Sequence, residues 1–98
     1  MTIATETRLI PLNYSNITLV PSVEGVYELA NSSQQIIYIG RSDNLQRRLN
    51  EHLNTTDPCI KSAAYFRFEK TYRSEQRERE LIDHFRRLNG RLPRCNNY

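Results

Sequence analysis

The sequence predicts an α+β fold in which helices pack on a small three-stranded sheet. Apolar and aromatic residues at 26–29 and 36–39 flank a short polar segment, a composition typical of a β-hairpin. Apolar and polar residues alternate over 64–69, as expected of a strand with one buried face. Residues 45–53 and 74–88 carry apolar side chains at helical spacing, and Asn89-Gly90 after the second segment is a common left-handed helix end. The first of these helices separates the third strand from the hairpin.

Each strand of the predicted hairpin carries a glycine and a tyrosine: Gly25 and Tyr27 in the first, Tyr38 and Gly40 in the second. A loop over residues 31–34 places Tyr27 directly opposite Tyr38, and cross-strand neighbours lie about 5 Å apart. The two phenols are then expected to share one patch of one face. Tyrosines in paired strands also serve as ordinary packing, so the pair by itself does not decide between packing and chemistry.

The segment after the hairpin predicts an amphipathic helix. Ser42 and Asp43 are helix-capping residues, and three leucines follow at helical spacing. At about 100° per residue, Arg48 and His52 lie on or beside the leucine stripe, whereas Arg47 points to the opposite side. An arginine beside an inward-facing stripe is costly to desolvate unless it meets an anion. Arg47 is therefore expected to be solvated, and Arg48 to be committed to a partner.

A glutamate occurs on the apolar face of the second predicted helix. The apolar residues of that face are Leu81, Ile82, Phe85 and Leu88. Glu78 lies three and four positions before the first two of them, near the middle of the stripe. A carboxylate in such a slot needs a cation or a hydrogen-bond donor, and a metal ion would serve. Glu75 lies at the edge of the face as a weaker candidate, and the alternative for Glu78 is a first-turn glutamate stabilised by the helix dipole.

Positive charge is concentrated in the second part of the chain. The net charge of the 98 residues is +3, but residues 1–40 carry one base against three acids and residues 41–98 carry thirteen bases against eight acids. Twelve of the fourteen bases are arginine, whose planar fork can hold a phosphate through two parallel hydrogen bonds. A basic face is more often ordinary solvated surface, so the distribution supports a polyphosphate partner without establishing one.

The ordered set of these motifs resembles the GIY-YIG nuclease domain. The matching residues are the Gly-Val-Tyr and Tyr-Ile-Gly runs of the hairpin, Arg48 and His52 behind them, Glu78 ahead of a Leu-Ile pair, and a closing Pro-x-x-Asn formed by Pro93 and Asn96. The family includes the N-terminal nuclease module of a bacterial excision-repair endonuclease, as well as homing, restriction and junction-cutting endonucleases. Each motif is weak in isolation, but their order is specific.

The resemblance spans residues 25–96 and implies the same architecture, with a mainly antiparallel sheet. We expect one domain over residues 1–98, in which residues 1–24 form an N-terminal extension that packs on the core. Residues 1–12 are expected to be loose, and the apolar stretch 17–23 to cover one edge of the core. The implied function is a metal-dependent endonuclease that hydrolyses phosphodiester bonds, with DNA as the expected substrate, in DNA repair or recombination.

The resemblance also implies a role for each central residue. Glu78 would hold one Mg²⁺ or Mn²⁺ ion. Tyr27 would deprotonate or orient the attacking water, a role that requires nearby positive charge because a free phenol titrates near pKa ~10. Tyr38 would orient the water or a phosphate oxygen, and Arg48 would neutralise the scissile phosphate. His52 would assist proton transfer or act as a structural donor.

Four further residues are expected to support the site. Asn96 would brace it, Arg41 would contact phosphate, and Gly25 and Gly40 would let backbone and substrate approach closely. Many relatives take their site preference from an attached recognition module, which we do not expect here. The enzyme would then have low specificity, recognise a DNA shape such as a flap or branch, or depend on a protein partner that supplies specificity.

Two other functions stay open at this stage. A nucleic-acid-binding module could keep the fold without turnover, and a protein-interaction domain could carry an idle site. Binding alone would not need an inward-facing Glu78, because that carboxylate repels phosphate unless a metal ion intervenes. The cation response of Glu78 therefore separates the nuclease from both alternatives.

The two cysteines, Cys59 and Cys95, lie far apart and lack the spacing of a zinc site or a redox motif. The sequence therefore predicts free thiols rather than a disulfide. It contains no N-terminal secretion signal and no run of about 20 apolar residues. A soluble cytoplasmic protein that does not contact membranes is expected.

Overall fold

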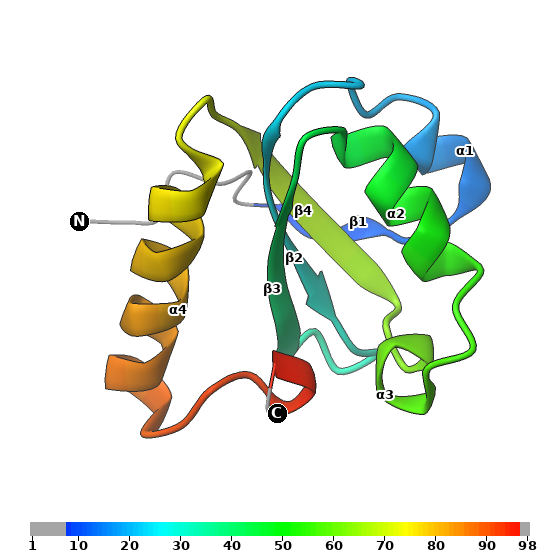
Figure 1. Ribbon diagram of the computed structural model, residues 1–98. Helices are drawn as coiled ribbons and strands as arrows, with labels where there is room; N and C mark the ends of the chain where they lie inside the picture. The colour runs from blue at the N-terminus through cyan, green and yellow to red at the C-terminus, as the bar shows by residue number, and fades with distance from the viewer. Residues whose placement is uncertain (1–7, 97–98) are drawn as a thin grey trace.

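The computed structural model describes residues 8–96 as a sheet covered on both faces (Figure 1). Helices α1, α2 and α3 lie on one side of the sheet and α4 lies on the other. The elements in chain order are β1 (Ile10–Pro11), α1 (Tyr14–Ile17), β2 (Gly25–Ala30), β3 (Ile36–Ser42), α2 (Leu45–Leu53), α3 (Pro58–Lys61), β4 (Tyr65–Lys70), α4 (Ser74–Asn89) and the 3₁₀ turn η1 (Arg94–Asn96). The strand order is β1-β4-β2-β3, so β3 forms one edge of the sheet.

The predicted α+β class and antiparallel sheet are confirmed, but the sheet has four strands rather than three. The additional strand is β1, in which Ile10 pairs with Phe66. Residues 1–12 were expected to be loose; residues 1–7 lie outside the described part, and the two residues of β1 are too few to show a period. Ile17 and Val20 lie in the core, while the division into core and extension stays a prediction.

The predicted register of the hairpin is wrong by two positions. Tyr27 pairs with Gly40, and Leu29 pairs with Tyr38. One position comes from the loop over residues 31–35, which is one residue longer than expected and in which Asn31 Oδ1 accepts hydrogen bonds from two backbone N–H groups. The other comes from a β-bulge, since Ala30 pairs with Ile36 but Leu29 pairs with Tyr38. Since side chains alternate with a period of two, this shift keeps both tyrosines on the same face. They are diagonal neighbours rather than directly opposed.

Two apolar clusters form the core, one on each face of the sheet. Tyr27, Leu29 and Leu49 belong to the larger cluster, which lies on the α2 side. The smaller cluster contains Val26 and Leu81 and lies under α4. Both clusters follow from the strand alternation and helical spacing in the sequence. The sheet therefore separates side chains that are neighbours in sequence onto different faces.

The caps of the two long helices differ in how well they were predicted. Asn44, rather than Ser42 or Asp43, caps α2, because its side chain accepts a hydrogen bond from the Arg47 N–H. The Ser42 hydroxyl instead bonds the backbone of Asn44. The end of α4 is confirmed at Gly90, which adopts the left-handed conformation with φ 73°.

The prediction of free thiols is wrong. Cys59 in α3 and Cys95 in η1 form a disulfide, with their Cα atoms 5.7 Å apart. Their separation of 36 residues in sequence carried no information about this proximity, which arises because α3 and η1 pack together. The bond fixes the turn that carries Asn96. Within residues 8–96, no helix has the length and apolar character needed to cross a membrane.

Candidate active site

Strands β2 and β3 and helix α2 bring two tyrosines and a histidine together. The Tyr27 hydroxyl lies 2.6 Å from His52 Nε2. The ring centroids of Tyr27 and Tyr38 are 6.1 Å apart, and each lies 5.4 Å from the His52 ring. The hairpin predicted that the two tyrosines share one face, and the GIY-YIG resemblance implied that His52 lies behind them. The structure brings them into one cluster on the α2 face.

Gly40 makes this cluster possible. A Cβ atom at this position would lie 2.6 Å from the Tyr27 hydroxyl oxygen and 2.8 Å from the Tyr38 ring. Real Cβ atoms essentially never approach so closely. Gly25 lets backbone approach closely, which is one half of the role expected of it, because its Cβ would meet the Glu69 carbonyl oxygen of β4 and the Leu45 side chain. The approach of substrate at Gly25 stays a prediction.

Burial controls the protonation of the cluster. The Tyr27 side chain is completely inaccessible to solvent, and its burial raises the pKa of its phenol; Tyr38 adds to this increase and Arg48 opposes it. Burial, followed by repulsion from Arg48, lowers the pKa of His52 to about 4. At neutral pH, Tyr27 is therefore protonated and His52 is neutral. In the tautomer of His52 that carries its ring hydrogen on Nδ1, the Tyr27 hydroxyl donates to Nε2.

Arg48 lies at the solvent side of this cluster. Its Nη1 atom donates a hydrogen bond of 2.9 Å to Glu51 Oε1, and 40% of its side chain is exposed. This hydrogen bond is the main cause that raises the pKa of Arg48. The anionic partner of Arg48 is thus a surface carboxylate one helical turn away, which i,i+3 spacing could have indicated. Arg47 is exposed, as predicted, and pairs with Asp43 and Glu51.

Glu78 lies on the other side of the β3 edge, together with Arg41. The Arg41 Nε atom is 3.7 Å from Glu78 Oε1. Partial burial raises the pKa of Glu78; Arg41 opposes this increase and Glu75 adds to it. Arg41 is on the α4 face because it pairs with Val26, whereas Gly40, the preceding residue, faces the tyrosines. The candidate site therefore straddles one edge strand.

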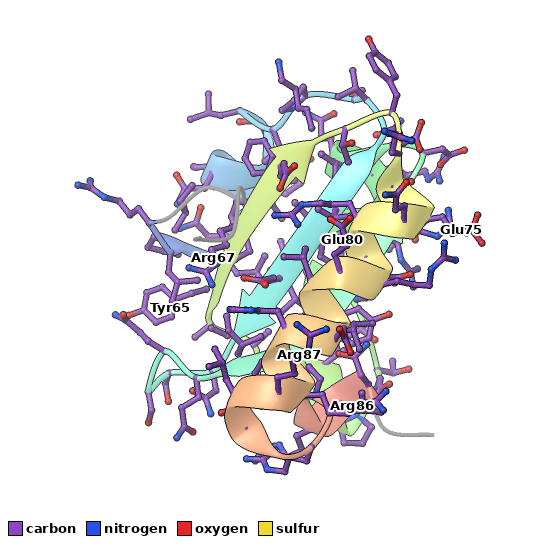
Figure 2. All side chains as sticks on the ribbon, turned by 90° about the vertical axis from the view of Figure 1, so that its left-hand side faces the viewer. Tyr65, Arg67, Glu75, Glu80, Arg86 and Arg87 are labelled. Atoms are coloured by element: carbon purple, nitrogen blue, oxygen red, sulfur yellow. A yellow bond between two sulfur atoms is a disulfide. The ribbon has the colours of Figure 1, made fainter. Side chains whose placement is uncertain are left out.

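The weaker candidate, Glu75, lies farther out. Figure 2 shows it near the start of α4, at the outer edge of the molecule. It pairs loosely with Arg79, at 3.8 Å. Within residues 8–96, no three His, Cys, Asp or Glu side chains converge as a metal site. Of the two glutamates proposed from the sequence, Glu78 is the more buried.

Asn96 holds the edge strand between the two sets of side chains. Its Oδ1 atom accepts a hydrogen bond of 2.7 Å from the Ile39 N–H, and its Nδ2 atom donates one of 2.8 Å to the Ile39 carbonyl. Ile39 lies between Tyr38 and Gly40, so the amide fixes the backbone at the centre of the candidate site. The neighbouring Cys95 anchors this turn through the disulfide. Sequence reasoning missed that second connection.

Sequence comparison assigns the chain to a family. Residues 3–87 match the family described as a domain of unknown function, DUF7508. The chain belongs to this family. No curated protein matches the sequence of this DUF7508 domain. The family description leaves the activity open, so the function has to be inferred from the site and the fold.

Solved structures share the fold of this DUF7508 domain. The magnesium-bound GIY-YIG N-terminal endonuclease domain of UvrC from Thermotoga maritima is 26% identical, with a TM-score of 0.60 and coverage of 74% of this chain and 88% of the other. An asparagine-to-alanine mutant of that domain, bound to its catalytic divalent cation, is 26% identical, with a TM-score of 0.60 and coverage of 74% and 87%. A tyrosine-to-phenylalanine mutant is 24% identical, with a TM-score of 0.61 and coverage of 86% and 93%. The predicted similarity to the GIY-YIG superfamily is confirmed.

Proposed function

We propose that this DUF7508 domain is a metal-dependent endonuclease that hydrolyses phosphodiester bonds in DNA. The observation that carries the proposal is the edge strand β3. Its Tyr38 joins Tyr27 and His52 on one face of the sheet, and its Arg41, two residues beyond Ile39, pairs with Glu78 on the other face. Such an arrangement offers proton-transfer groups, phosphate-binding groups and a cation ligand along one edge strand. The similarity to a UvrC endonuclease domain bound to a catalytic divalent cation supports the same function.

The chemistry of Glu78 fits a hard divalent cation. Its carboxylate is partly buried, and its one ion pair, with Arg41, spans 3.7 Å, so oxygen lone pairs are available. Mg²⁺ is commonly bound by one or two carboxylates, with water and substrate phosphate completing its shell. Glu78 would hold the ion, either Mg²⁺ or Mn²⁺. The bound ion would supply charge stabilisation at the leaving oxygen.

Tyr27 and Tyr38 have different roles in the proposed reaction. Because its pKa is raised, Tyr27 does not act as a phenolate. Its hydroxyl oxygen is closed to solvent in this structure, so substrate binding would have to open a path to it; it would then accept a proton from the attacking water while its own proton passes to Nε2 of the neutral His52. Tyr38 is only partly buried and is the phenol that can contact the water or a phosphate oxygen directly. The Tyr27–His52 pair would gain the one proton that the attacking water loses, and that proton would reside on His52 as an imidazolium.

Two arginines are accessible to a substrate phosphate. Arg48 and Arg41 are 40% and 45% exposed, on opposite sides of β3. A phosphate can replace Glu51 as the partner of Arg48, because surface ion pairs contribute about 0–1 kcal/mol. Arg48 would then stabilise the charge that grows on the scissile phosphate. Arg41 would orient a neighbouring phosphate oxygen.

The finer assignments remain part of the proposal. The GIY-YIG resemblance supports three of them: DNA rather than RNA as the substrate, a role in repair or recombination, and a protein partner that supplies specificity. A cytoplasmic location also stays a prediction. Disulfides are rare in reducing compartments, so the Cys59–Cys95 bond argues for measuring the thiol state of the protein in its host.

Cleavage of a labelled substrate panel tests the proposal. The panel contains single-stranded, duplex, flap and branched DNA and an RNA, each with Mg²⁺ or Mn²⁺. Glu78→Ala and Arg48→Ala should each reduce cleavage about 10²–10³-fold, as loss of a transition-state contact does elsewhere. The matched controls are Glu80→Ala on the same helix and Arg47→Ala beside Arg48, and both should retain activity. Cleavage that survives in both site variants would indicate a contaminant.

Metal binding separates the nuclease from the alternative, a nucleic-acid-binding module without turnover. The absence of a three-ligand cluster within residues 8–96 is the observation that favours the alternative. Millimolar Mg²⁺ should raise the melting temperature of the wild type but not of Glu78→Ala. A wild type that binds DNA, cleaves no member of the panel and shows no metal response would support the binding module.

A further inference from the structure

A cavity lies on the α4 face of the sheet, away from the tyrosine cluster. It has a volume of about 410 Å³ and lies between the hairpin loop, the C-terminal half of α4 and the segment after it. Small-molecule sites commonly occupy about 300–1,000 Å³. Figure 2 shows this face, with Arg67 on β4 and Arg86 and Arg87 on the C-terminal half of α4. None of the residues of the proposed active site lines the cavity.

Two of the arginines at this cavity have no ion pair within residues 8–96. Most arginines pair with a carboxylate, as Arg87 does with Asp83 at 2.6 Å. Arg91 and Arg94 both line the cavity and are exposed, and neither makes an ion pair or side-chain hydrogen bond within residues 8–96. Two arginines without anionic partners in this part of the chain therefore line one hollow. Such forks bind phosphate and carboxylate oxygens.

The floor of the cavity does not repel an anion. Its one carboxylate, Glu28, is 4% exposed and bonds the Arg67 Nε atom at 2.5 Å. The charge of Glu28 is thus balanced by Arg67, and Arg91 and Arg94 leave an excess of two positive charges around the cavity. An anion entering from solvent would meet this excess first, because the two unpaired arginines are exposed.

One wall of the cavity is apolar and open. Phe85 and Leu88 lie three positions apart on α4 and both line the cavity. The sequence places Leu88 on the core face of the helix, yet 72% of it is exposed. A large apolar side chain beside unpaired cationic groups suits a ligand that has both an apolar body and an anionic group.

We propose that this cavity binds a small organic phosphate. The phosphate lies against Arg91 and Arg94, and a flat apolar body lies against Phe85 and Leu88. Two separate guanidinium groups suit the three acceptor oxygens of a phosphomonoester better than the two oxygens of a carboxylate. The inference does not rest on the proposed nuclease activity, because the cavity shares no residue with that site.

A titration monitored by backbone amide NMR tests the proposal, with phenyl phosphate, inorganic phosphate and benzoate as probes. Phenyl phosphate should bind at least tenfold more tightly than either of the others and shift the amides of Leu81 and His84 rather than that of Tyr38. The Arg91→Ala/Arg94→Ala variant should weaken its binding at least tenfold. Arg86→Ala, which changes an α4 arginine that does not line this cavity, should bind normally. Leu88→Ala should reduce the preference for phenyl phosphate over inorganic phosphate.

Two results would overturn the inference: phenyl phosphate that binds no better than inorganic phosphate, or binding that the double variant leaves unchanged. A nucleoside 5′-monophosphate and a 5′-phosphorylated dinucleotide then identify the source of the phosphate. Tighter binding of the monomer indicates a free metabolite, and tighter binding of the dinucleotide indicates a strand end. Unfolding temperatures of all variants check that the cavity remains folded.

Discussion

Tyr27 and His52 lie in the protein interior, with exposed fractions of 0% and 7%, whereas 40% of the Arg48 side chain and 26% of the Glu78 side chain are exposed. The interior pair is held by packing and by one hydrogen bond of 2.6 Å. The outer residues are held by surface ion pairs, at 2.9 Å between Arg48 and Glu51 and at 3.7 Å between Arg41 and Glu78. Because of this difference, we expect substitutions in the two groups to have different effects. Changes to Tyr27 and His52, the interior half of the site, should lower stability. Changes to Arg48, Glu78 and Tyr38, the outer half, should lower activity at constant stability.

The largest effect on stability is expected from the disulfide, which supports the interior half through the turn that carries Asn96. Replacing both cysteines, in Cys59→Ser/Cys95→Ser, opens a loop of 36 residues. Loop-closure entropy predicts a loss of roughly 3–4 kcal/mol in the free energy of unfolding. Urea denaturation of both proteins measures it. A reductant should lower the free energy of unfolding of the wild type to that of the variant and leave the variant unchanged. Equal stability of the oxidised and reduced wild type would contradict the prediction.

The second effect is a pH dependence that arises from His52. Its pKa is about 4 in the folded protein and near 6.5 in the unfolded chain, so the unfolded chain binds the proton first as the pH falls. His52 therefore stabilises the fold fully above about pH 6.5, and this contribution is lost as the pH falls toward about 4. The expected loss is roughly 2–3 kcal/mol. Urea denaturation at pH 7 and pH 4.5 measures it.

The control for this pH dependence is His52→Gln, which keeps an acceptor for the Tyr27 hydroxyl but does not titrate. The difference in stability between the two pH values should shrink in this variant. Carboxylates that titrate in the same range, Glu78 among them, contribute equally to both proteins and cancel in the comparison. An identical pH dependence in wild type and variant would show that His52 does not titrate as its burial implies.

Residues in regular segments could be predicted from the sequence. The alternation of Phe66 and Phe68 with polar neighbours identified β4, and the leucine spacing and Gly90 identified α2 and the end of α4. The proximity of Tyr27 and Tyr38 also followed from alternation, because a shift by two positions preserves the face. Periodicity reports which face a side chain occupies, and it was reliable for that reason.

Features that depend on tertiary packing could not be predicted. The exact pairing of β2 and β3 depends on the conformation of the loop at Asn31, where several hydrogen-bonded turns are possible. The Cys59–Cys95 bond depends on where α3 and η1 meet. The low pKa of His52 depends on burial and on Arg48, both set by packing. In the last two cases the decisive contact joins segments with no common local pattern, and in the first the local sequence permits more than one turn.

The third effect, on packing, is expected from Gly40→Ala. The new methyl group would lie 2.6 Å from the Tyr27 hydroxyl oxygen and 2.8 Å from the Tyr38 ring. Relief of this overlap must displace the buried ring or the edge strand, at a cost of about 1–3 kcal/mol. Thermal unfolding measures the loss. A variant as stable as the wild type would show that the Tyr27 ring moves freely and that the interior half is not rigid.

The smallest effect gives the sharpest comparison, because Tyr27→Phe and Tyr38→Phe remove the same atom from the two halves. Loss of the Tyr27 hydroxyl leaves buried His52 Nε2 without its hydrogen bond and should cost about 1 kcal/mol of stability. Tyr38 is only partly buried, so water can replace its hydroxyl, and its removal should change stability by less than about 0.5 kcal/mol. Denaturation and cleavage assays on both variants measure the two properties. If Tyr38→Phe lost more stability than Tyr27→Phe, Tyr38 would belong to the interior half. Arg48 would then be the first residue of the outer half on that face.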